Sequence, residues 1–279
     1  MEQKLKVGVL GATGMVGQRF VTLLENHPWF ELVAVAASPR SAGKTYEEAV
    51  GGRWKMKTPM PEAAKKLVVL NVNQVEEVAA QVDFVFSAVD MSKDEIRAIE
   101  EAYAKAEVPV VSNNSAHRWT PDVPMMVPEL NPEHAEIIPY QRKRLGTKRG
   151  FIAVKPNCSI QSYTPALHAL REFEPTLVVA TTYQAISGAG KTFKDWPEMI
   201  DNVIPYIAGE EEKSEQEPLR IWGKIEDGVI KKAEGPLITT QCIRVPVEDG
   251  HTAAVFVNFK KKPTKEEIID RWNNLSRRS

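Results

Sequence analysis

The feature that most constrains the fold lies near the start of the chain, where a glycine-rich turn joins an apolar run to a helical pattern. Residues 6–10 (KVGVL) are typical of a short buried strand, and Gly11, Gly14 and Gly17 follow at once with GxxGxxG spacing. The spacing of apolar side chains then predicts a helix over residues 18–26. A strand, a tight glycine turn and a helix together predict a dinucleotide site, because the turn lets a pyrophosphate approach the amides at the helix start.

The pattern that begins at this turn continues through the first half of the chain. Apolar runs at 32–37, 67–70, 82–88 and 108–111 alternate with polar or helical stretches such as 92–105. Alternation of this kind predicts parallel strands joined by right-handed crossovers. The predicted fold class is therefore α/β, with a Rossmann-type doubly wound parallel sheet over residues 1–150.

The sequence pattern changes after Asn113, where five prolines occur in a segment that is expected to be rich in loops. We place the domain boundary near residue 150. Beyond it, strands are expected at 177–182, 238–245 and 252–259, and a last helix begins at Thr264, whose spacing to Glu267 matches a capping box. Residues 151–279 are thus expected to form a second, mixed α+β catalytic and dimerisation domain.

Charge and cysteine content exclude several classes of protein. The 36 Lys+Arg residues balance 37 Asp+Glu, which argues against nucleic-acid or membrane-surface binding, and the basic run at 141–149 is expected to be a solvated loop. The first residues do not match a signal peptide, and no stretch approaches about 18 uncharged apolar residues. Two cysteines are too few for a disulfide scaffold or a zinc finger, so we expect reduced thiols, a cytoplasmic location and no metal.

The segment after the second predicted strand bears on the choice of cofactor. An NAD site usually carries an Asp or Glu about 20 residues beyond the glycines. Here the corresponding segment has no carboxylate and offers Ser38, Arg40, Ser41 and Lys44 where a 2′-phosphate would lie. This composition favours NADP over NAD; the alternative is a surface turn whose Arg40 and Lys44 only face water.

Cys158 is the candidate nucleophile. It follows an apolar run and a turn and precedes a helical pattern, and a helix start stabilises a thiolate. The alternative is an inert buried thiol, which Cys242, inside an apolar strand, fits better. His251, seven residues beyond Arg244, is the candidate partner, whereas His168 is expected to pack in the helix. Cysteine with histidine also suits a cysteine hydrolase, but the dinucleotide domain favours aldehyde oxidation through a thioester.

Six motifs, taken in order along the chain, resemble aspartate-β-semialdehyde dehydrogenases, and in particular their archaeal and fungal-type branch. The motifs extend the resemblance from residue 5 to about 274: residues 11–17 (GATGMVG), 112–118 (SNNSAHR), 156–159 (PNCS), 184–190 (QAISGAG), 209–213 (GEEEK) and 244–251 (RVPVEDGH).

The resemblance implies a role for each of eight side chains. Cys158 attacks the carbonyl, Gln184 orients the intermediate and His251 is the general acid and base. Arg244 binds the substrate α-carboxylate, and Glu210 meets the amino group, although the acidic run 210–212 also suits a solvated helix start. Lys213 and Arg118, with Asn114 nearby, receive the phosphate. The implied contacts of NADP(H) are Gly11, Thr13, Gly14, Met15, Val16, Ser38, Arg40, Ser41, Lys44, Ser87, Ser187 and Gly188.

The implied reaction is the reversible, NADPH-dependent reductive dephosphorylation of L-aspartyl 4-phosphate to aspartate 4-semialdehyde, in the biosynthesis of Lys, Met, Thr and Ile. The implied assembly is a homodimer or homotetramer formed through the second domain. Three alternatives stay open: a malonyl-CoA or succinyl-CoA reductase of the same branch, an N-acetyl-glutamyl-phosphate reductase, and an inactive NADP-binding fragment.

The sequence departs from the family at its C-terminus. Family members continue for several tens of residues, with a further strand and a closing helix beside the nicotinamide, whereas this chain stops at Ser279. We therefore expect a truncated, frame-shifted or partial chain. A missing strand exposes a sheet edge, so we expect lower stability, weaker NADP binding and lower activity than in a full-length relative.

Overall fold

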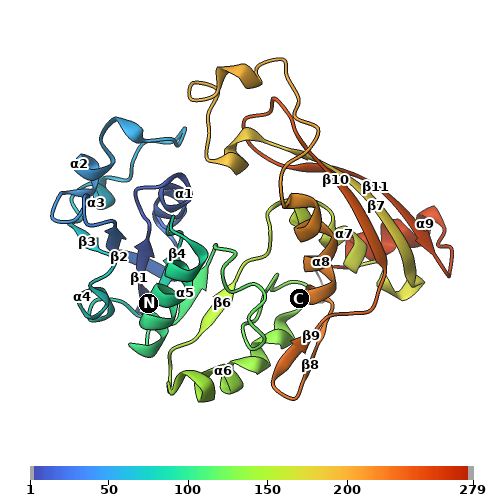
Figure 1. The fold of residues 1–279 in the computed structure, drawn as a ribbon, viewed down its shortest axis with the longest axis horizontal. Coiled ribbons are helices and arrows are strands. Elements are labelled where there is room, and N and C mark those ends of the chain that lie inside the picture. Colours follow the sequence, from blue (N-terminus) through green and yellow to red (C-terminus); the bar gives the residue numbers. More distant parts are fainter. Residues whose placement is uncertain (1–2, 276–279) are drawn as a thin grey trace. The chain divides into compact units, whose positions relative to one another are not determined.

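The computed structural model describes residues 3–275, and the chain folds into two compact units (Figure 1). The first unit runs up to Pro124 and includes Glu136–Lys155. The second consists of Met125–Ala135 and the residues from Pro156 onward.

The first unit is built on a six-stranded sheet in which every neighbouring pair is parallel. Its spatial order starts at one edge with the third strand and reverses between the first and the fourth. Such an order is that of a doubly wound Rossmann sheet, so the predicted fold class is confirmed. In order across the sheet the strands are β3 (Val69–Asn71), β2 (Phe30–Ala37), β1 (Leu5–Leu10), β4 (Phe84–Ser87), β5 (Val110–Ser112) and β6 (Ile152–Val154).

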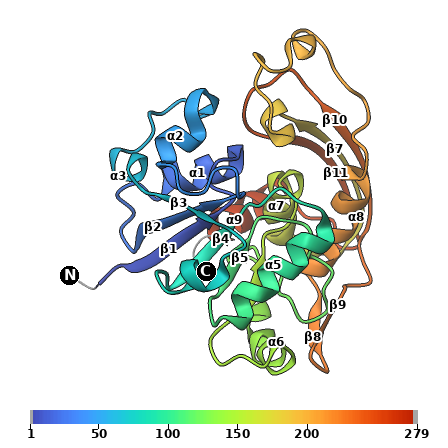
Figure 2. The same cartoon turned by 60° about the vertical axis from the view of Figure 1, so that its left-hand side comes forward.

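Six helices accompany this sheet (Figure 2). Right-handed crossovers place α1 on one face and α4 and α5, which contact each other, on the other. Both faces are therefore covered, and Val7, Val9, Val35, Val85 and Val110 are completely buried between the layers. The helices are α1 (Met15–Leu23), α2 (Tyr46–Val50), α3 (Glu62–Lys65), α4 (Val75–Ala79), α5 (Lys93–Lys105) and α6 (Ile138–Leu145).

The basic run 141–149 is not the solvated loop that the sequence predicted. It forms most of α6, which ends at Gly146 in a left-handed conformation, and the turn that follows. Arg144 makes two hydrogen bonds to the Asp122 carboxylate, at 2.5 and 2.9 Å, and Arg149 pairs with Asp83. Acidic partners from distant segments, which the local pattern does not reveal, therefore order this run.

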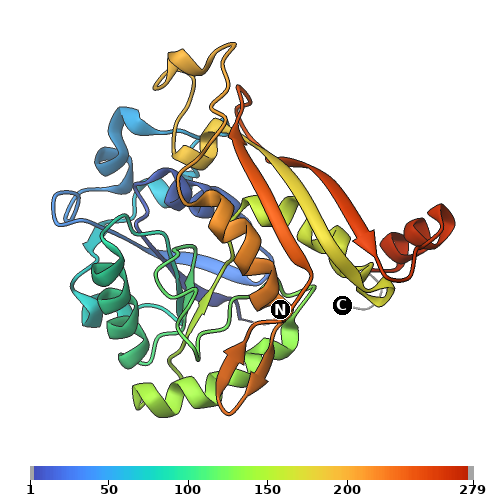
Figure 3. The ribbon, with the colours of Figure 1, turned by 45° about the vertical axis from the view of Figure 1, so that its right-hand side comes forward.

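The second unit is built on a three-stranded sheet with order β10-β7-β11 (Figure 3). The strands are β7 (Pro175–Gln184), β10 (Leu237–Arg244), which runs parallel to β7, and β11 (Thr252–Phe259), which runs antiparallel to it. Helix α8 (Glu210–Ile221) packs on β10. The Glu215 and Glu211 carboxylates accept hydrogen bonds from the backbone N–H groups of Thr240 and Cys242. These bonds satisfy donors at the edge of the sheet.

The remaining elements of the second unit are short. β8 (Lys224–Glu226) and β9 (Val229–Lys231) form a hairpin, and α9 (Lys265–Leu275) begins with the predicted capping box between Thr264 and Glu267. The single helix expected after Cys158 is instead a 3₁₀ turn (Ser159–Ser162) followed by α7 (Thr164–His168). Pro165 at the start of α7 has no N–H to bond back to the preceding turn, so the two pieces are separate.

No helix among residues 3–275 combines the length and the apolar character needed to cross a lipid bilayer.

Glu107 allows a test of how the stability of the first unit depends on pH. Its carboxylate accepts hydrogen bonds from the backbone N–H groups of Lys148, Arg149 and Gly150, and these bonds lower its pKa from the ordinary 4.5 to about 2. A lowered pKa contributes stability that is complete above the ordinary value and is lost as the pH falls towards 2. We predict that Glu107→Gln lowers the free energy of unfolding at pH 7 and that the difference from wild type shrinks between pH 4.5 and 2.

Urea unfolding of both proteins across that pH range measures the difference, which should be modest because the carboxylate is exposed. Glu101→Gln on α5 is a suitable control, since Glu101 accepts hydrogen bonds from Lys105 and Arg144 and not from the turn at residues 148–150. Parallel stability curves for wild type and Glu107→Gln would contradict the prediction.

Candidate functional site

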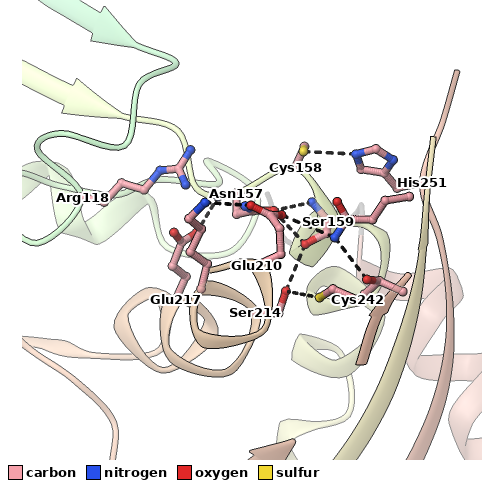
Figure 4. A network of polar contacts seen from close by, with 12 residues as sticks. Arg118, Asn157, Cys158, Ser159, Glu210, Ser214, Glu217, Cys242 and His251 are labelled. Atoms are coloured by element: carbon pink, nitrogen blue, oxygen red, sulfur yellow. Dashed lines mark hydrogen bonds and ion pairs between the residues drawn. The ribbon is translucent and has the colours of Figure 1, made fainter. Parts of the chain in front are cut away.

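Cys158 lies in the second unit, exposed, at the start of the 3₁₀ turn that follows β6. Its Sγ atom is 3.2 Å from Nε2 of His251, which lies 93 residues further along the chain (Figure 4). A cysteine within hydrogen-bonding distance of an imidazole has the geometry of an activated nucleophile. Cys242, in contrast, is completely buried in β10, as the sequence analysis expected.

The orientation of His251 is set by the backbone. His251 follows Gly250, whose φ of +91° makes the turn between β10 and β11. The N–H of Ala185 donates to Nδ1 of His251 at 3.0 Å. Because Nδ1 accepts this bond, the neutral imidazole carries its proton on Nε2, the atom that faces Cys158 Sγ. The ring can therefore donate a hydrogen bond to a negatively charged sulfur or oxygen at that position.

The loop after β7 packs closely against this imidazole. The N–H groups of Ile186 and Ser187 bond to the carbonyls of Val247 and Glu248, in the segment that leads to His251. A Cβ atom on Gly188 would lie 3.0 Å from the Cε1 atom of His251 and from an Nη atom of Arg244. Ser187 and Gly188, implied as cofactor contacts, thus also pack against the segment that carries His251 and against Arg244.

Arg244 ends β10 and is 6% exposed. Its Nη1 donates to the carbonyl of Ala185 at 2.7 Å, and its own backbone pairs with Ile204. Burial lowers the pKa of the guanidinium, while the charge of Glu210 opposes that shift. A buried guanidinium anchored by a carbonyl is well suited to bind a carboxylate through two hydrogen bonds.

Glu210, at the start of α8, is surrounded by hydrogen-bond donors. Lys213 Nζ lies 2.7 Å from one carboxylate oxygen, and the side-chain amides of Asn157 and Gln184 donate to the other at 2.9 and 3.4 Å. Burial raises the pKa of the carboxyl, but Lys213 and the two amides outweigh it, so the pKa lies below its ordinary value. Gln184 also donates to Thr182, so both of its amide hydrogens have acceptors.

Asn157, which was not among the predicted site residues, connects Glu210 to the turn that carries Cys158. Its N–H donates to Glu217 at 2.5 Å, and its Oδ1 accepts bonds from the N–H and the hydroxyl of Ser159 at 2.8 and 2.7 Å. Ser159 in turn contacts Ser214 of α8 at 3.1 Å (Figure 4). The position of Asn157 beside Cys158 in the PNCS motif was the sequence feature that could have indicated its importance. Its contacts, however, depend on a helix more than 50 residues away.

The remaining residues implied for phosphate binding divide between the units. Lys213 belongs to the second unit, whereas Arg118 and Asn114 belong to the first. Arg118 is 6% exposed, and its guanidinium donates to the carbonyls of Lys155 and Asn113. Asn114 uses its side-chain amide hydrogens on Ser87 and Glu100 and its backbone N–H on Ser112. It therefore lacks the donor that the expected phosphate contact requires.

A pocket of about 240 Å³ opens in the first unit at the carboxyl ends of its strands. Its lining comes from the glycine turn, from the ends of β2 and β3, from the segment after β4 and from Arg53, which was not among the predicted site residues. The lining residues are Gly11, Thr13, Gly14, Ala37, Ser38, Arg53, Val72, Ala88, Val89, Asp90 and Met91. Of the other implied cofactor contacts, Met15 and Val16 begin α1 and Ser87 ends β4, beside this lining. Arg40, Ser41 and Lys44 lie further along the turn after β2 and are not part of it.

The three glycines of the turn serve different purposes. Gly11 has φ +77°, and a Cβ on Gly17 would come within 2.2 Å of the Gly11 carbonyl, so both are required by the chain itself. A Cβ on Gly14 would meet only the Gly11 carbonyl, at 3.5 Å, an ordinary contact. Among residues 3–275, no side chain caps the start of α1. A helix start without a side-chain cap and the missing side chain at Gly14 fit the pyrophosphate of a dinucleotide.

Comparison with known proteins identifies the class of enzyme. Residues 6–138 match the family model "Semialdehyde dehydrogenase, NAD binding domain", and residues 166–278 match "Semialdehyde dehydrogenase, dimerisation domain". The two units, one with the nucleotide-binding fold and one with the cysteine–histidine pair, thus correspond to the two domains of a semialdehyde dehydrogenase.

Individual relatives narrow the family. The chain is 41% identical over 275 residues to the aspartate-semialdehyde dehydrogenase of Methanothermobacter thermautotrophicus, covering 97% of this chain and 77% of that protein. It is 43% identical over 271 residues to the enzyme of Aspergillus fumigatus, covering 95% and 73%. The structure of the Candida albicans enzyme with NADP superposes with a TM-score of 0.82 at 37% identity, covering 96% and 76%. The chain belongs to the aspartate-semialdehyde dehydrogenase family, which confirms the resemblance that its motifs carry.

The different roles of Gly14 and Gly17 lead to a prediction. Gly17→Ala drives a methyl group into backbone atoms and should lower the free energy of unfolding by about 2 kcal/mol. Gly14→Ala should lower it by less than about 1 kcal/mol, yet weaken NADPH binding by about tenfold, because the methyl group occupies the approach of the pyrophosphate. Denaturant unfolding and a fluorescence titration with NADPH measure the two effects. Equal affinity in wild type and Gly14→Ala would contradict the assignment of this turn.

Proposed function

We propose that this chain catalyses the reversible reductive dephosphorylation of L-aspartyl 4-phosphate to L-aspartate 4-semialdehyde with NADPH. The observation that carries the proposal is the 3.2 Å contact between Cys158 Sγ and His251 Nε2, with Arg244 and Glu210 anchored in the same unit. A thiol nucleophile beside an imidazole, a cation and an anion suits a substrate that carries an acyl group, a carboxylate and an ammonium group.

The thiolate of Cys158 attacks the carbonyl carbon of the acyl phosphate, and inorganic phosphate leaves with the electron pair of the broken C–O bond. A thioester on Cys158 remains. The nicotinamide, when bound, supplies a hydride to the thioester carbon. His251, with its proton on Nε2, stabilises the oxygen that gains negative charge in the resulting thiohemiacetal. Breaking of the C–S bond then releases the aldehyde and restores the thiolate.

The charged residues divide the recognition of the substrate. Arg244 binds the α-carboxylate in this proposal, since its guanidinium is buried and held by Ala185. Glu210 receives the ammonium group, because its lowered pKa keeps it ionised. Lys213 and Arg118 supply positive charge for the phosphate. Gln184, bonded to Glu210, holds that carboxylate and offers its Oε1 to the reacting group.

NADP rather than NAD is the proposed cofactor. The segment after β2 offers two serines, Arg40 and Lys44 and no carboxylate, and a further cation, Arg53, lines the pocket itself. The Candida albicans relative was solved with NADP. A reducing, cytoplasmic setting belongs to the same proposal, because Cys158 acts only as a free thiol.

The test is NADPH formation from aspartate semialdehyde, NADP and phosphate. Wild type should show phosphate-dependent turnover, and Cys158→Ala should lose it by at least about a thousandfold, because the covalent step is gone. Cys242→Ala, which removes the buried thiol, is the matched control and should retain activity. Turnover that requires coenzyme A instead of phosphate, or that survives in Cys158→Ala, would overturn the proposal.

We also propose that the second unit forms a homodimer through the open face of its sheet, as the family model's description suggests. Val178, Ala180 and Thr182 of β7 are buried on one face, and the alternate positions face the other way. That second face carries Tyr183, Leu237 and Phe256, which are 38%, 69% and 59% exposed. Exposed apolar side chains gathered on one sheet face are typical of an interface.

Phe256→Asp should convert the dimer to a monomer, because it places a charge in the apolar interface. Light scattering after size-exclusion chromatography gives the mass. Tyr140→Asp, at an exposed aromatic residue of the first unit, is the control and should remain dimeric. A wild-type monomer, or a Phe256→Asp dimer, would refute this interface; a wild-type tetramer that Phe256→Asp reduces to dimers would place the interface within a larger assembly.

A further inference from the structure

Glu100 is a buried carboxylate that the proposed chemistry does not use. It lies on α5 and is 0% exposed, whereas Asp94 and Glu95 on the same helix are exposed. Burial of a carboxylate is unfavourable unless hydrogen bonds compensate for the lost water. The partners of Glu100 therefore indicate what the residue is for.

Those partners lie at the carboxyl end of β5 and in the loop that follows it, beside the end of β4. The hydroxyl of Ser112, the last residue of β5, donates to Glu100 Oε1 at 2.6 Å, and the Asn114 side-chain amide donates to the same oxygen at 3.0 Å. Asn114 Nδ2 also lies 3.2 Å from the hydroxyl of Ser87, the last residue of β4. Ser87 and Ser112 are both buried. Glu100 thus contacts the end of β5 directly and the end of β4 through Asn114.

This network determines which atom Asn114 can present to a ligand. Both hydrogens of Nδ2 are donated, one to Glu100 and one to Ser87, and the backbone N–H is donated to Ser112 Oγ. The carboxylate accepts only, so it orients the amide with nitrogen towards itself and Oδ1 away. Asn114 can therefore offer an acceptor and not a donor.

The position of this acceptor is informative. Ser87 is followed directly by Ala88–Met91, which line the pocket of the first unit. Ligands of doubly wound sheets bind in the crevice at the carboxyl ends of the strands. A dinucleotide whose pyrophosphate lies at Gly14 extends its nicotinamide half towards the ends of β4 and β5, and the carboxamide of that ring carries an NH₂ donor.

We propose that Glu100 is a positioning residue that orients Asn114 so that Asn114 Oδ1 accepts a hydrogen bond from the carboxamide NH₂ of the nicotinamide. This inference rests on the proposed function and deepens it, since it names what fixes the rotation of the reacting ring. It also replaces the phosphate role that the sequence analysis gave to Asn114, because a phosphate would need the donors that Glu100, Ser87 and Ser112 already use.

The test compares binding of three nucleotides to the folded chain by calorimetry. NADP carries the carboxamide, its 3-acetylpyridine analogue keeps the carbonyl but has a methyl group in place of NH₂, and 2′-phospho-ADP-ribose lacks the ring. Wild type should bind NADP about tenfold more tightly than the analogue, the effect of one hydrogen bond. Glu100→Ala and Asn114→Ala should both lose this preference and should bind 2′-phospho-ADP-ribose as wild type does.

Two controls separate positioning from a general structural role. Glu100→Gln keeps an acceptor oxygen for Ser112 and Asn114, and Oε2 makes no hydrogen bond within residues 3–275 that the substitution would break, so the preference should return. Glu101→Ala, the neighbouring acid on α5, should leave the preference unchanged. Thermal melts report folding, and Asn114→Ala tests the proposal even if Glu100→Ala does not fold, since it leaves the bond between Glu100 and Ser112 in place.

The outcomes distinguish this inference from the function on which it rests. Three results would overturn the role of Glu100 and Asn114 while phosphate-dependent turnover stands. The Glu100→Ala and Asn114→Ala variants could keep the preference for NADP over the analogue, they could bind 2′-phospho-ADP-ribose as weakly as they bind NADP, or wild type could show no preference. A wild-type chain that binds neither NADP nor its analogue would overturn the proposed function together with this inference.

Discussion

The hydrogen bonds of Asn157 are the interaction on which the rest of the candidate site depends. The backbone N–H binds Glu217 and the side-chain amide binds Glu210, so the turn that carries Cys158 is held to α8 at two points seven residues apart. Helix α8 is in turn held to β10 through Glu211 and Glu215, and β10 leads into the segment that carries His251. The distance between the thiol and the imidazole is therefore maintained by a helix that contributes neither group. Such indirect support is effective because buried hydrogen bonds are costly to leave unmade.

Electrostatic balance within the second unit follows from the same arrangement. Glu210 lies against Lys213, and the charge of Glu210 stabilises the charged form of Arg244, so Glu210 and Arg244 each have an opposite charge within the chain. Burial alone would disfavour the charged forms of Glu210 and Arg244. The lowered pKa of Glu210 shows that its donors overcome this effect. A substrate that carries both signs of charge can exchange with these internal partners without leaving a buried charge unpaired.

In the first unit, polar residues gather where the parallel strands end. The glycine turn connects the end of β1 to the start of α1, at which no side chain of residues 3–275 forms a cap, and Ser87 and Ser112 end β4 and β5 and are buried. Glu100 accepts from Ser112 and from Asn114 beyond it, and Arg97 of the same helix donates to the Ala116 carbonyl. One helix thus sets the conformation of the loop after β5. The apolar side chains packed on the sheet make it rigid, and the polar groups at the carboxyl ends of its strands orient the hydrogen-bonding groups that a ligand can contact.

Features that have a local signal could be predicted from the sequence. Alternating apolar runs predicted the order of the strands in the first unit, the run 252–259 matches β11 residue for residue, and the glycine spacing and the PNCS motif predicted a cofactor turn and a reactive Cys158. Which distant groups meet depends on the tertiary fold. Four sets of contacts join segments that apolar periodicity treats as independent. They are the 3.2 Å contact between Cys158 and His251, the contacts of Asn157 with α8, the ion pairs of basic residues with Asp83 and Asp122, and the hydrogen bonds that Asn114 donates. The physical reason is that apolar periodicity reports which face of an element is buried, whereas the partner of a polar side chain depends on how whole elements pack.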